Sequence, residues 1–413
     1  MTNEDGAGYI GTIYLGSEDQ PAKVLFDTGS DFLAVTSDLC LDPSLGKQEQ
    51  DEPVFNTTSF VYVPSGKDLR KCKSTAYLSK ESKTAHRLGK DDEQLDYGSA
   101  KLSGKLFNDR TCLDANRTAC VPIDFLGLYQ AKGLDDIDGI LGLAVHPEKE
   151  RRNLNYVWAM KNSKVIDQAI VSFSIAGPES SDTSYAIFGG LNEAQIVGGV
   201  GGLQKIQTMA YRPDWMHSVK QWALEGRNMY YNGEEFNLAK EQKYPAIIDT
   251  GSSNFGVPDH TFKALTEKWE KDIGRDKLDC VNDDNFCQVM QPCTEVAPKL
   301  HSVGIQIADV VFEMTPELYL HQAEGSRCQF AIHSNQMKGS SGNLYLIGDT
   351  LLRHLYQVYD FENETISLGV NTHSEGKIKM YEPGKKPGDG SKLQTEDEKM
   401  NIETAGRFNE QTV

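Results

Sequence analysis

The sequence predicts a chain of two β-rich halves, each built around an Asp-Thr-Gly-Ser loop. Three observations support this prediction. Apolar runs typical of strands lead into both loops, in AKVLFDTGSDFLAV and in KYPAIIDTGSSNFGVP. Residues 8–36, which contain the first loop, alternate between apolar and polar types. An Asp loop, a predicted helix and an apolar-apolar-Gly segment occur in each half, so the repeat has the scale of half the chain.

The first residues of the two loops, Asp27 and Asp249, are the candidate catalytic pair. Folding alone does not require a carboxylate on a tight glycine turn twice, so we expect the two side chains to meet. Two carboxyl groups at hydrogen-bond distance share one proton, because both cannot readily be charged. The charged group can take a proton from water while the protonated group donates to a carbonyl oxygen. A plain Asp-Gly turn would explain one such loop, but not two with matching flanks.

The remaining loop residues fit the same hypothesis. Glycine allows backbone N–H groups to approach the carboxylates, the threonine hydroxyls can lock the two loops together, and the serine hydroxyls can bind the outer carboxyl oxygens. These supporting residues are Thr28, Gly29, Ser30, Thr250, Gly251 and Ser252.

Both loops resemble those of the pepsin-like aspartic proteases, such as cathepsin D. The resemblance extends from about Tyr9 to about Val370. It also rests on other spaced motifs, namely GYIGTIYLG, DGILGLA, VSFSIAG with SYAIFGGLN, YLIGDTLLR and VYDFENETISLGV. It implies an all-β-dominated bilobal fold, in which two β-lobes with a few short helices enclose a deep cleft. The lobes are expected at 1–200, with the first Asp loop and a flap, and at 201–370, followed by a polar, disordered tail at 371–413.

The resemblance also implies a flap hairpin and a substrate pocket. QLDYGSAKLSG at 94–104 resembles the flap, with Tyr97 as its ring and Gly98 and Ser99 at its tip. The pocket before the cut would be lined by Leu25, Tyr97, Ile137 and Ile140, which favours large apolar side chains. The sequence departs from the family at Ala34, where a Trp usually contacts the flap Tyr, and at Ala100, where Gly is usual. Either the flap lacks that tether, or another side chain, such as Phe32 or a residue of the 65–93 insertion, fills the place of the Trp.

The function that follows is an acid-pH endopeptidase that cuts polypeptides without a cofactor or metal. A second hypothesis is a non-catalytic peptide-binding protein on the same fold, although such proteins usually lose an Asp or a loop glycine. A glycosidase carboxylate pair is disfavoured, because those groups stand apart. The net charge of −18 argues against nucleic-acid and anionic-membrane partners. No apolar run is long enough to span a membrane, and a monomer is expected.

The eight cysteines and three Asn-x-Ser/Thr sequons, at Asn56, Asn116 and Asn363, predict an oxidising compartment of the secretory pathway. A lysosome, a digestive vacuole and secretion are all compatible with this. The N-terminus lacks a signal pattern, so we expect a mature portion or a truncated gene model. The predicted disulfides join Cys112 to Cys120, Cys328 to one of Cys280, Cys287 or Cys293, and Cys40 to Cys72.

Three other segments carry specific expectations. Helical spacing predicts helices over 153–167 and 259–273. The glycine-rich IVGGVGGL at 196–203 lacks the order of a nucleotide-binding loop and is interpreted as a turn. The polar stretch 65–93 is interpreted as an inserted surface loop that holds Cys72.

Overall fold

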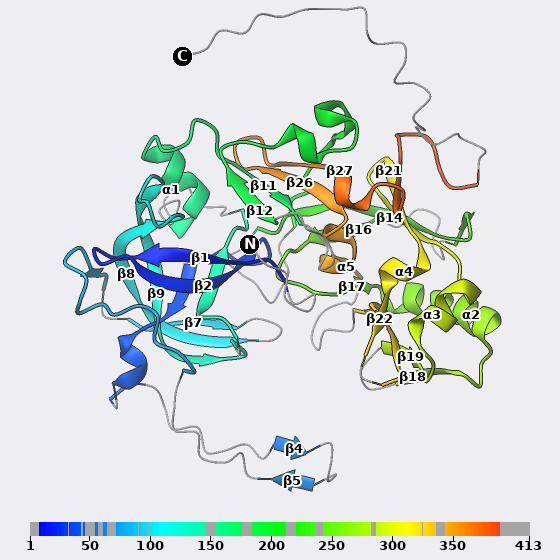
Figure 1. Cartoon of the computed structure of the whole chain (residues 1–413), viewed down its shortest axis with the longest axis horizontal. Coiled ribbons are helices and arrows are strands. Elements are labelled where there is room, and N and C mark those ends of the chain that lie inside the picture. The colour runs from blue at the N-terminus through cyan, green and yellow to red at the C-terminus, as the bar shows by residue number, and fades with distance from the viewer. Residues whose placement is uncertain are drawn as a thin grey trace, which may run out of the picture.

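The structure is a computed structural model that describes residues 8–31, 33–42, 44–45, 54–56, 61–63, 72–89, 91–96, 100–134, 136–145, 154–175, 184–211, 220–236, 243–281, 286–323, 325–335 and 343–388. Strands dominate this part of the chain and form two lobes with a further sheet between them (Figure 1). The predicted all-β-dominated, bilobal fold class is therefore confirmed. In the described residues no helix has the length and apolar character needed to cross a membrane.

The first lobe is built on a sheet with strand order β1-β2-β10-β3-β9-β8-β6, and β7 also pairs with β8. In β2, buried Ala22, Val24 and Phe26 alternate with more exposed residues, so one face packs into the core. The strands are β1 (Ile10–Leu15), β2 (Gln20–Asp27), β3 (Leu33–Thr36), β6 (His86–Arg87), β7 (Glu93–Asp96), β8 (Lys101–Cys112), β9 (Cys120–Lys132) and β10 (Gly139–Gly142).

The second lobe repeats this plan with strand order β24-β17-β25-β16-β14-β20-β21-β28, and β15 pairs with β14. A smaller sheet in the same lobe has the order β18-β19-β23-β22. The larger sheet comprises β14 (Ala223–Tyr231), β15 (Glu234–Glu235), β16 (Tyr244–Ile248), β17 (Phe255–Val257), β20 (Val303–Ile307), β21 (Val310–Met314), β24 (Ile332–Ser334), β25 (Tyr345–Ile347) and β28 (Ile378–Tyr381). The smaller one comprises β18 (Leu278–Val281), β19 (Phe286–Val289), β22 (Leu320–Gln322) and β23 (Cys328–Phe330).

The sheet between the lobes draws on both halves of the chain. Its order is β12-β11-β26-β27-β13, so C-terminal strands pair with strands from the middle of the sequence. The expected boundary at 200/201 therefore falls among strands of one shared sheet. The strands are β11 (Ile170–Ser174), β12 (Tyr185–Phe188), β13 (Gln204–Gln207), β26 (Leu355–Asp360) and β27 (Thr365–Val370).

Helices are few and short in the described chain, apart from α2 (Asp259–Ile273). This helix buries Phe262, Leu265, Trp269 and Ile273 along one side, and Gly274 follows with a φ of 103°. It confirms the helix predicted over 259–273. The others are α1 (Tyr156–Asn162), within the range predicted at 153–167, and α3 (Cys293–Val296), α4 (Pro316–Tyr319) and α5 (Asp349–Leu352). The 3-10 turns are η1 (Asp38–Leu41), η3 (Glu193–Gln195), η4 (Gly199–Gly202), η5 (Ala297–Lys299) and η6 (Thr372–Ser374).

The predicted disordered tail is wrong for residues 371–381. The turn η6 is followed by β28, which pairs antiparallel with β21. Ile378 of β28 is buried and Tyr381 donates a hydrogen bond to Glu313 Oε2 (2.6 Å). A polar segment is thus held by an open strand edge, to which its backbone can bond whatever its composition. Residues 389–413 lie outside the described part of the chain.

The described residues of 65–93 are exposed or half-buried, as a surface loop predicts, except for Cys72, Tyr77 and Ser82, so the interpretation is wrong only in missing an anchor to the core. Tyr77 is fully buried, with its ring against Phe107 and Phe125 at centroid distances of 5.7 and 4.9 Å. Its hydroxyl donates to Asp109 Oδ2 (2.8 Å), and β6 adds to the edge of the sheet. One large ring in a polar stretch is therefore enough to anchor the segment to the core. Residues 54–56 and 61–63 form the hairpin β4 (Val54–Asn56) and β5 (Val61–Val63).

All eight cysteines are paired, which agrees with an oxidising compartment. The structure contains the predicted Cys112–Cys120 bond, which closes the β8–β9 hairpin, and the predicted Cys40–Cys72 bond. Cys328 pairs with Cys293, so the alternatives left open by the sequence are resolved, and Cys280 pairs with Cys287.

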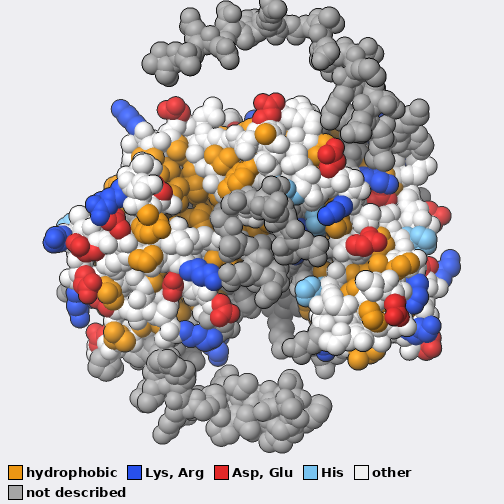
Figure 2. Space-filling view, viewed as in Figure 1, with side chains coloured by type: hydrophobic (Ala, Val, Ile, Leu, Met, Phe, Trp, Pro, Cys, Tyr) orange, Lys and Arg blue, Asp and Glu red, His pale blue; other side chains and the backbone are white. Residues whose placement is uncertain are grey.

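Charged side chains of both signs are interspersed over the visible face of both lobes (Figure 2). The net charge of −18 is therefore not gathered into one acidic area on this face.

Candidate active site

The two Asp-Thr-Gly-Ser loops occupy equivalent places in the two lobes. The first follows β2 and the second follows β16. The segments DGILGLA and YLIGDTLLR supply β10 and β25, each of which lies parallel to the strand before the loop and antiparallel to the strand after it. Leu143 N–H donates to the Asp27 carbonyl (2.7 Å), and Asp249 N–H donates to the Ile347 carbonyl (3.0 Å). Each loop is thus held by a strand that passes between its two arms.

The threonine side chains join the two loops through a reciprocal set of buried hydrogen bonds. Thr28 Oγ1 donates to the Ile248 carbonyl (2.8 Å) and accepts from Thr250 N–H (3.0 Å). Thr250 Oγ1 donates to the Phe26 carbonyl (2.7 Å) and accepts from Thr28 N–H (2.9 Å). Both threonines are fully buried. The lobes are therefore tied together directly behind the two carboxyl groups, as the sequence predicts.

The carboxyl groups face each other across the loop glycines. Gly29 N–H donates to Asp27 Oδ1 (2.8 Å), and Gly251 N–H donates to Asp249 Oδ1 (2.9 Å). A Cβ on Gly29 would lie 2.6 Å from Asp249 Oδ1, and a Cβ on Gly251 would collide with Asp27 Oδ1. Each glycine thus makes room for the carboxyl group of the opposite loop.

The two carboxyl groups have unequal surroundings. Burial raises the pKa of Asp27 well above its usual range, and the charge of Asp249 and a hydrogen bond with it raise the pKa further. The Ser30 hydroxyl and Gly29 N–H oppose this rise, although Ser30 Oγ makes no hydrogen bond of normal geometry to a described residue. In the second loop, Ser252 Oγ donates to Asp249 Oδ2 (2.7 Å). Because the charge of each carboxyl group disfavours ionisation of the other, the pair favours a state in which the two groups share one proton.

Three of the four predicted pocket residues, Leu25, Ile137 and Ile140, lie in or against one aliphatic cluster beside the first loop. In the sheet Ile140 lies opposite Leu25 on one side and Ala34 on the other. Leu25 and Ile137, both partly buried, pack against a buried aliphatic cluster, which comprises Ala34, Ala100, Leu102, Leu126, Leu128, Leu134 and Ile140.

This aliphatic cluster leaves Ala34 fully buried, so aliphatic side chains fill its surroundings. That finding favours a filled site over an empty one, but the side chains are Leu and Ile of this lobe and not a residue of the described part of the 65–93 insertion; Phe32 lies outside the described residues. Strands β7 and β8 form the expected hairpin, with Leu95 opposite Leu102. The proposed flap residues Tyr97, Gly98 and Ser99 lie outside the described residues.

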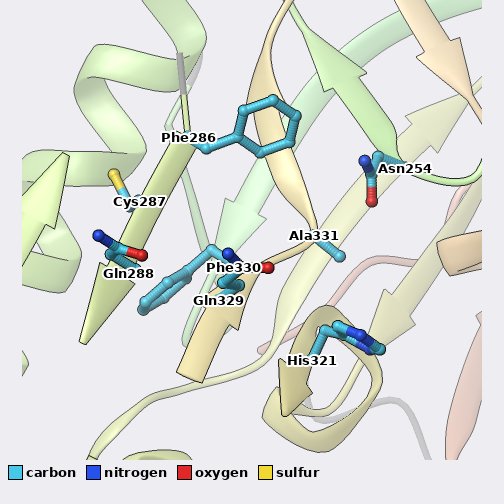
Figure 3. A pocket seen from close by; sticks show the side chains of 8 residues that line it. All are labelled: Asn254, Phe286, Cys287, Gln288, His321, Gln329, Phe330 and Ala331. Carbon is cyan, nitrogen blue, oxygen red and sulfur yellow. The ribbon is translucent and has the colours of Figure 1, made fainter. Parts of the chain in front are cut away.

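A cavity of about 330 Å³ lies in the second lobe, beyond the second Asp loop (Figure 3). Asn254 reaches it from the chain just after that loop, and the other side chains come from the smaller sheet and the residue that follows it. Its lining mixes amide groups with rings and includes Asn254, Phe286, Gln288, His321, Gln329 and Phe330. No local sequence pattern indicates this cavity, because its residues are far apart along the chain.

A second feature missed from the sequence is the contact of residues 220–222 with the first lobe. Gln221 Nε2 donates to the Gly29 carbonyl (3.1 Å), and Trp222 Nε1 donates to the Leu143 carbonyl (2.8 Å). The bond to Gly29 spans 192 residues of sequence. No local pattern in the sequence could have indicated it.

Comparison with known proteins gives a consistent answer over nearly the whole chain. The sequence model of the family described as eukaryotic aspartyl protease matches residues 8–371. Pepsin-2B of Gadus morhua is 24% identical over 373 residues, which cover 89% of this chain and 97% of the relative. Vacuolar protease A of Neurospora crassa is 26% identical over 385 residues, covering 90% and 80%, and gastricsin of Oryctolagus cuniculus is 24% identical over 381 residues, covering 88% and 81%. The family match, which spans both Asp loops and both apolar-apolar-Gly strands, shows that this chain belongs to the eukaryotic aspartyl protease family.

Proposed function

We propose that the chain is an acid-pH aspartic endopeptidase that hydrolyses peptide bonds of proteins, with Asp27 and Asp249 as the catalytic pair. The observation that carries the proposal is the reciprocal bonding of Thr28 and Thr250, which brings the two carboxyl groups face to face. A pair with one proton between its two groups supplies a base and an acid at the same place.

In the proposed reaction a water bound between the carboxyl groups attacks the scissile carbonyl carbon. The charged carboxylate takes a proton from the water, and the protonated carboxyl donates to the carbonyl oxygen, which gives a hydrated tetrahedral intermediate. The C–N bond then breaks as the carboxyl group that took the proton from water passes it to the nitrogen, while the other carboxylate takes a proton from one of the two hydroxyls. The pair returns to its starting state and no covalent enzyme intermediate forms. Burial and the charge of Asp249 raise the pKa of Asp27, which supports one proton being held within the pair in acid.

Substrate preference is proposed from the aliphatic cluster beside the first Asp loop and from the cavity beyond the second. Leu25, Ile137 and Ile140, together with Tyr97 of the flap, would hold a large apolar side chain next to the scissile bond. The cavity that contains Asn254 would contact a substrate residue farther from the bond, because Asn254 follows the second Asp loop directly. Binding energy from such remote contacts places the bond at the reacting groups.

The proposed compartment is the secretory pathway, with a lysosome-like organelle, a digestive vacuole or secretion as the destination. Four disulfides among the described residues support an oxidising environment. The relatives include proteins named vacuolar protease A and gastricsin.

The test is cleavage of a denatured protein at about pH 4, with and without a peptide analogue that carries a secondary hydroxyl at the scissile position. Cleavage that the analogue blocks is expected for the wild type, and the Asp27→Asn variant should be inactive with an unchanged fold. Binding of the analogue without any cleavage would instead indicate a non-catalytic peptide-binding protein.

A further inference from the structure

The segment Lys220–Trp222, just before β14, crosses from the second half of the chain onto the first lobe. Lys220 forms an antiparallel bridge with Val145, which follows β10. Trp222 Nε1 donates to the Leu143 carbonyl (2.8 Å), and Leu143 N–H in turn donates to the Asp27 carbonyl (2.7 Å). The segment is thus bonded to the residues that directly follow β10, the strand that supports the first Asp loop.

The same segment is also tied to the second Asp loop. Ile248 N–H, immediately before Asp249, donates to the Trp222 carbonyl (2.9 Å). The Trp222 ring is fully buried and meets the rings of Tyr359 and Phe361 edge-on, at centroid distances of 5.3 and 5.0 Å. Such packing restricts the backbone of its neighbour Gln221, because that backbone cannot shift without moving the buried indole.

Gln221 is almost fully buried, with 2% of its surface exposed, and its Nε2 donates to the Gly29 carbonyl (3.1 Å). The peptide before Gly29 gives its N–H to Asp27 Oδ1, and the peptide after Gly29 gives its carbonyl to Gln221. Glycine has no side chain to restrict its backbone, so bonds on both sides are what fix its conformation. An amide stays neutral at every pH, so this bond persists in acid, where a carboxylate partner would change its charge.

We propose that Gln221 is a positioning residue for the catalytic pair. Its amide fixes the Gly29 carbonyl and thereby the neighbouring N–H that binds Asp27. This inference rests on the proposed function and adds a residue from the opposite half of the chain to the support of the first Asp loop. Without the amide donor of Gln221, the loop retains its threonine hydrogen bonds, but the peptide group after Gly29 can rotate. The expected result is slower chemistry with little change in substrate binding.

The test compares three variants of the full chain with the wild type by kcat, KM and thermal midpoint on one peptide substrate. Gln221→Met keeps the length and apolar volume but cannot donate, so kcat should fall roughly tenfold to a hundredfold at every pH with KM within about threefold. Gln221→Glu can donate only when protonated, so its kcat should be low above its own pKa and should approach the wild-type value as the pH falls. Gln20→Met is the matched control, because it removes a buried amide that donates to the Leu78 carbonyl (3.2 Å) away from the Asp loops.

If Gln221 has only a structural role, Gln221→Met should lower the thermal midpoint by about as much as Gln20→Met and leave kcat of the folded enzyme unchanged. That result would overturn the inference. It would also be overturned if Gln221→Glu failed to recover in acid relative to the Met variant. If Gln221→Met does not fold, the pH dependence of the Glu variant decides, since its protonated form has the shape of Gln. A wild type without peptidase activity would contradict the proposed function itself, whereas an active wild type with an unaffected Met variant contradicts this inference alone.

Discussion

Replacing Thr250 by Val should weaken the fold at the point where the two lobes join. Valine has nearly the shape of threonine, so the change removes one hydroxyl and little packing. Thr250 Oγ1 donates to the Phe26 carbonyl and accepts from Thr28 N–H, and the site is fully buried. Two buried backbone groups then lose a partner, at a cost of about 1–3 kcal/mol each, so the free energy of unfolding should fall by about 2–6 kcal/mol.

The assay is urea denaturation followed by tryptophan fluorescence with the disulfides intact, together with kcat on a peptide substrate. Thr250→Ser keeps the hydroxyl and serves as the control. We expect the Val variant to lose several-fold more stability than the Ser variant and to lose most of its kcat. Equal unfolding free energies for the two variants, within about 0.5 kcal/mol, would refute the claim that these hydroxyl bonds hold the loops together.

The other predictions concern a glycine, a histidine and an alanine. Gly29→Ala should abolish turnover, because the added Cβ lies 2.6 Å from Asp249 Oδ1, and kinetics with circular dichroism as the folding control checks this. Burial, with a smaller contribution from nearby cations, lowers the pKa of His354 in the folded state from 6.5 to about 3. As the pH falls below 6.5, the unfolded chain therefore binds a proton at His354, whereas the folded chain binds it only near pH 3. The stability should therefore drop by about 3 kcal/mol between neutral pH and pH 4 from this group, and urea denaturation should show a smaller drop for His354→Gln. Ala34→Trp should lower the melting temperature and kcat/KM on short and long peptides alike, since aliphatic side chains surround Ala34; a gain on short peptides would instead favour the untethered flap.

Local sequence patterns predicted the loops and the longest helix well. The paired apolar runs that end in Asp27 and Asp249 placed both turns, because strand and turn chemistry act over a few residues. The helical spacing of the apolar residues Phe262, Leu265, Trp269 and Ile273 predicted α2 with the bounds that the structure has. The threonine bonds between the loops could also be anticipated, because the repeat itself implied that the loops meet.

Long-range contacts account for what the sequence could not predict. Tyr77 enters the core from a polar stretch, and β28 pairs with an open edge that composition does not reveal. Gln221 reaches Gly29 across 192 residues, and the cavity beside Asn254 forms from separate strands. Each of these depends on where two distant segments pack, which a local pattern does not encode.

The most direct test of the account is the pH dependence of kcat/KM for the wild type, Asp27→Asn and Asp249→Asn on one peptide substrate. The account predicts a bell-shaped profile on the acid side of neutrality for the wild type, because activity requires one proton on the pair, and nearly complete loss of turnover in each variant with the fold retained. A wild-type profile that rises steadily through neutral pH, or an Asn variant with wild-type activity, would contradict it.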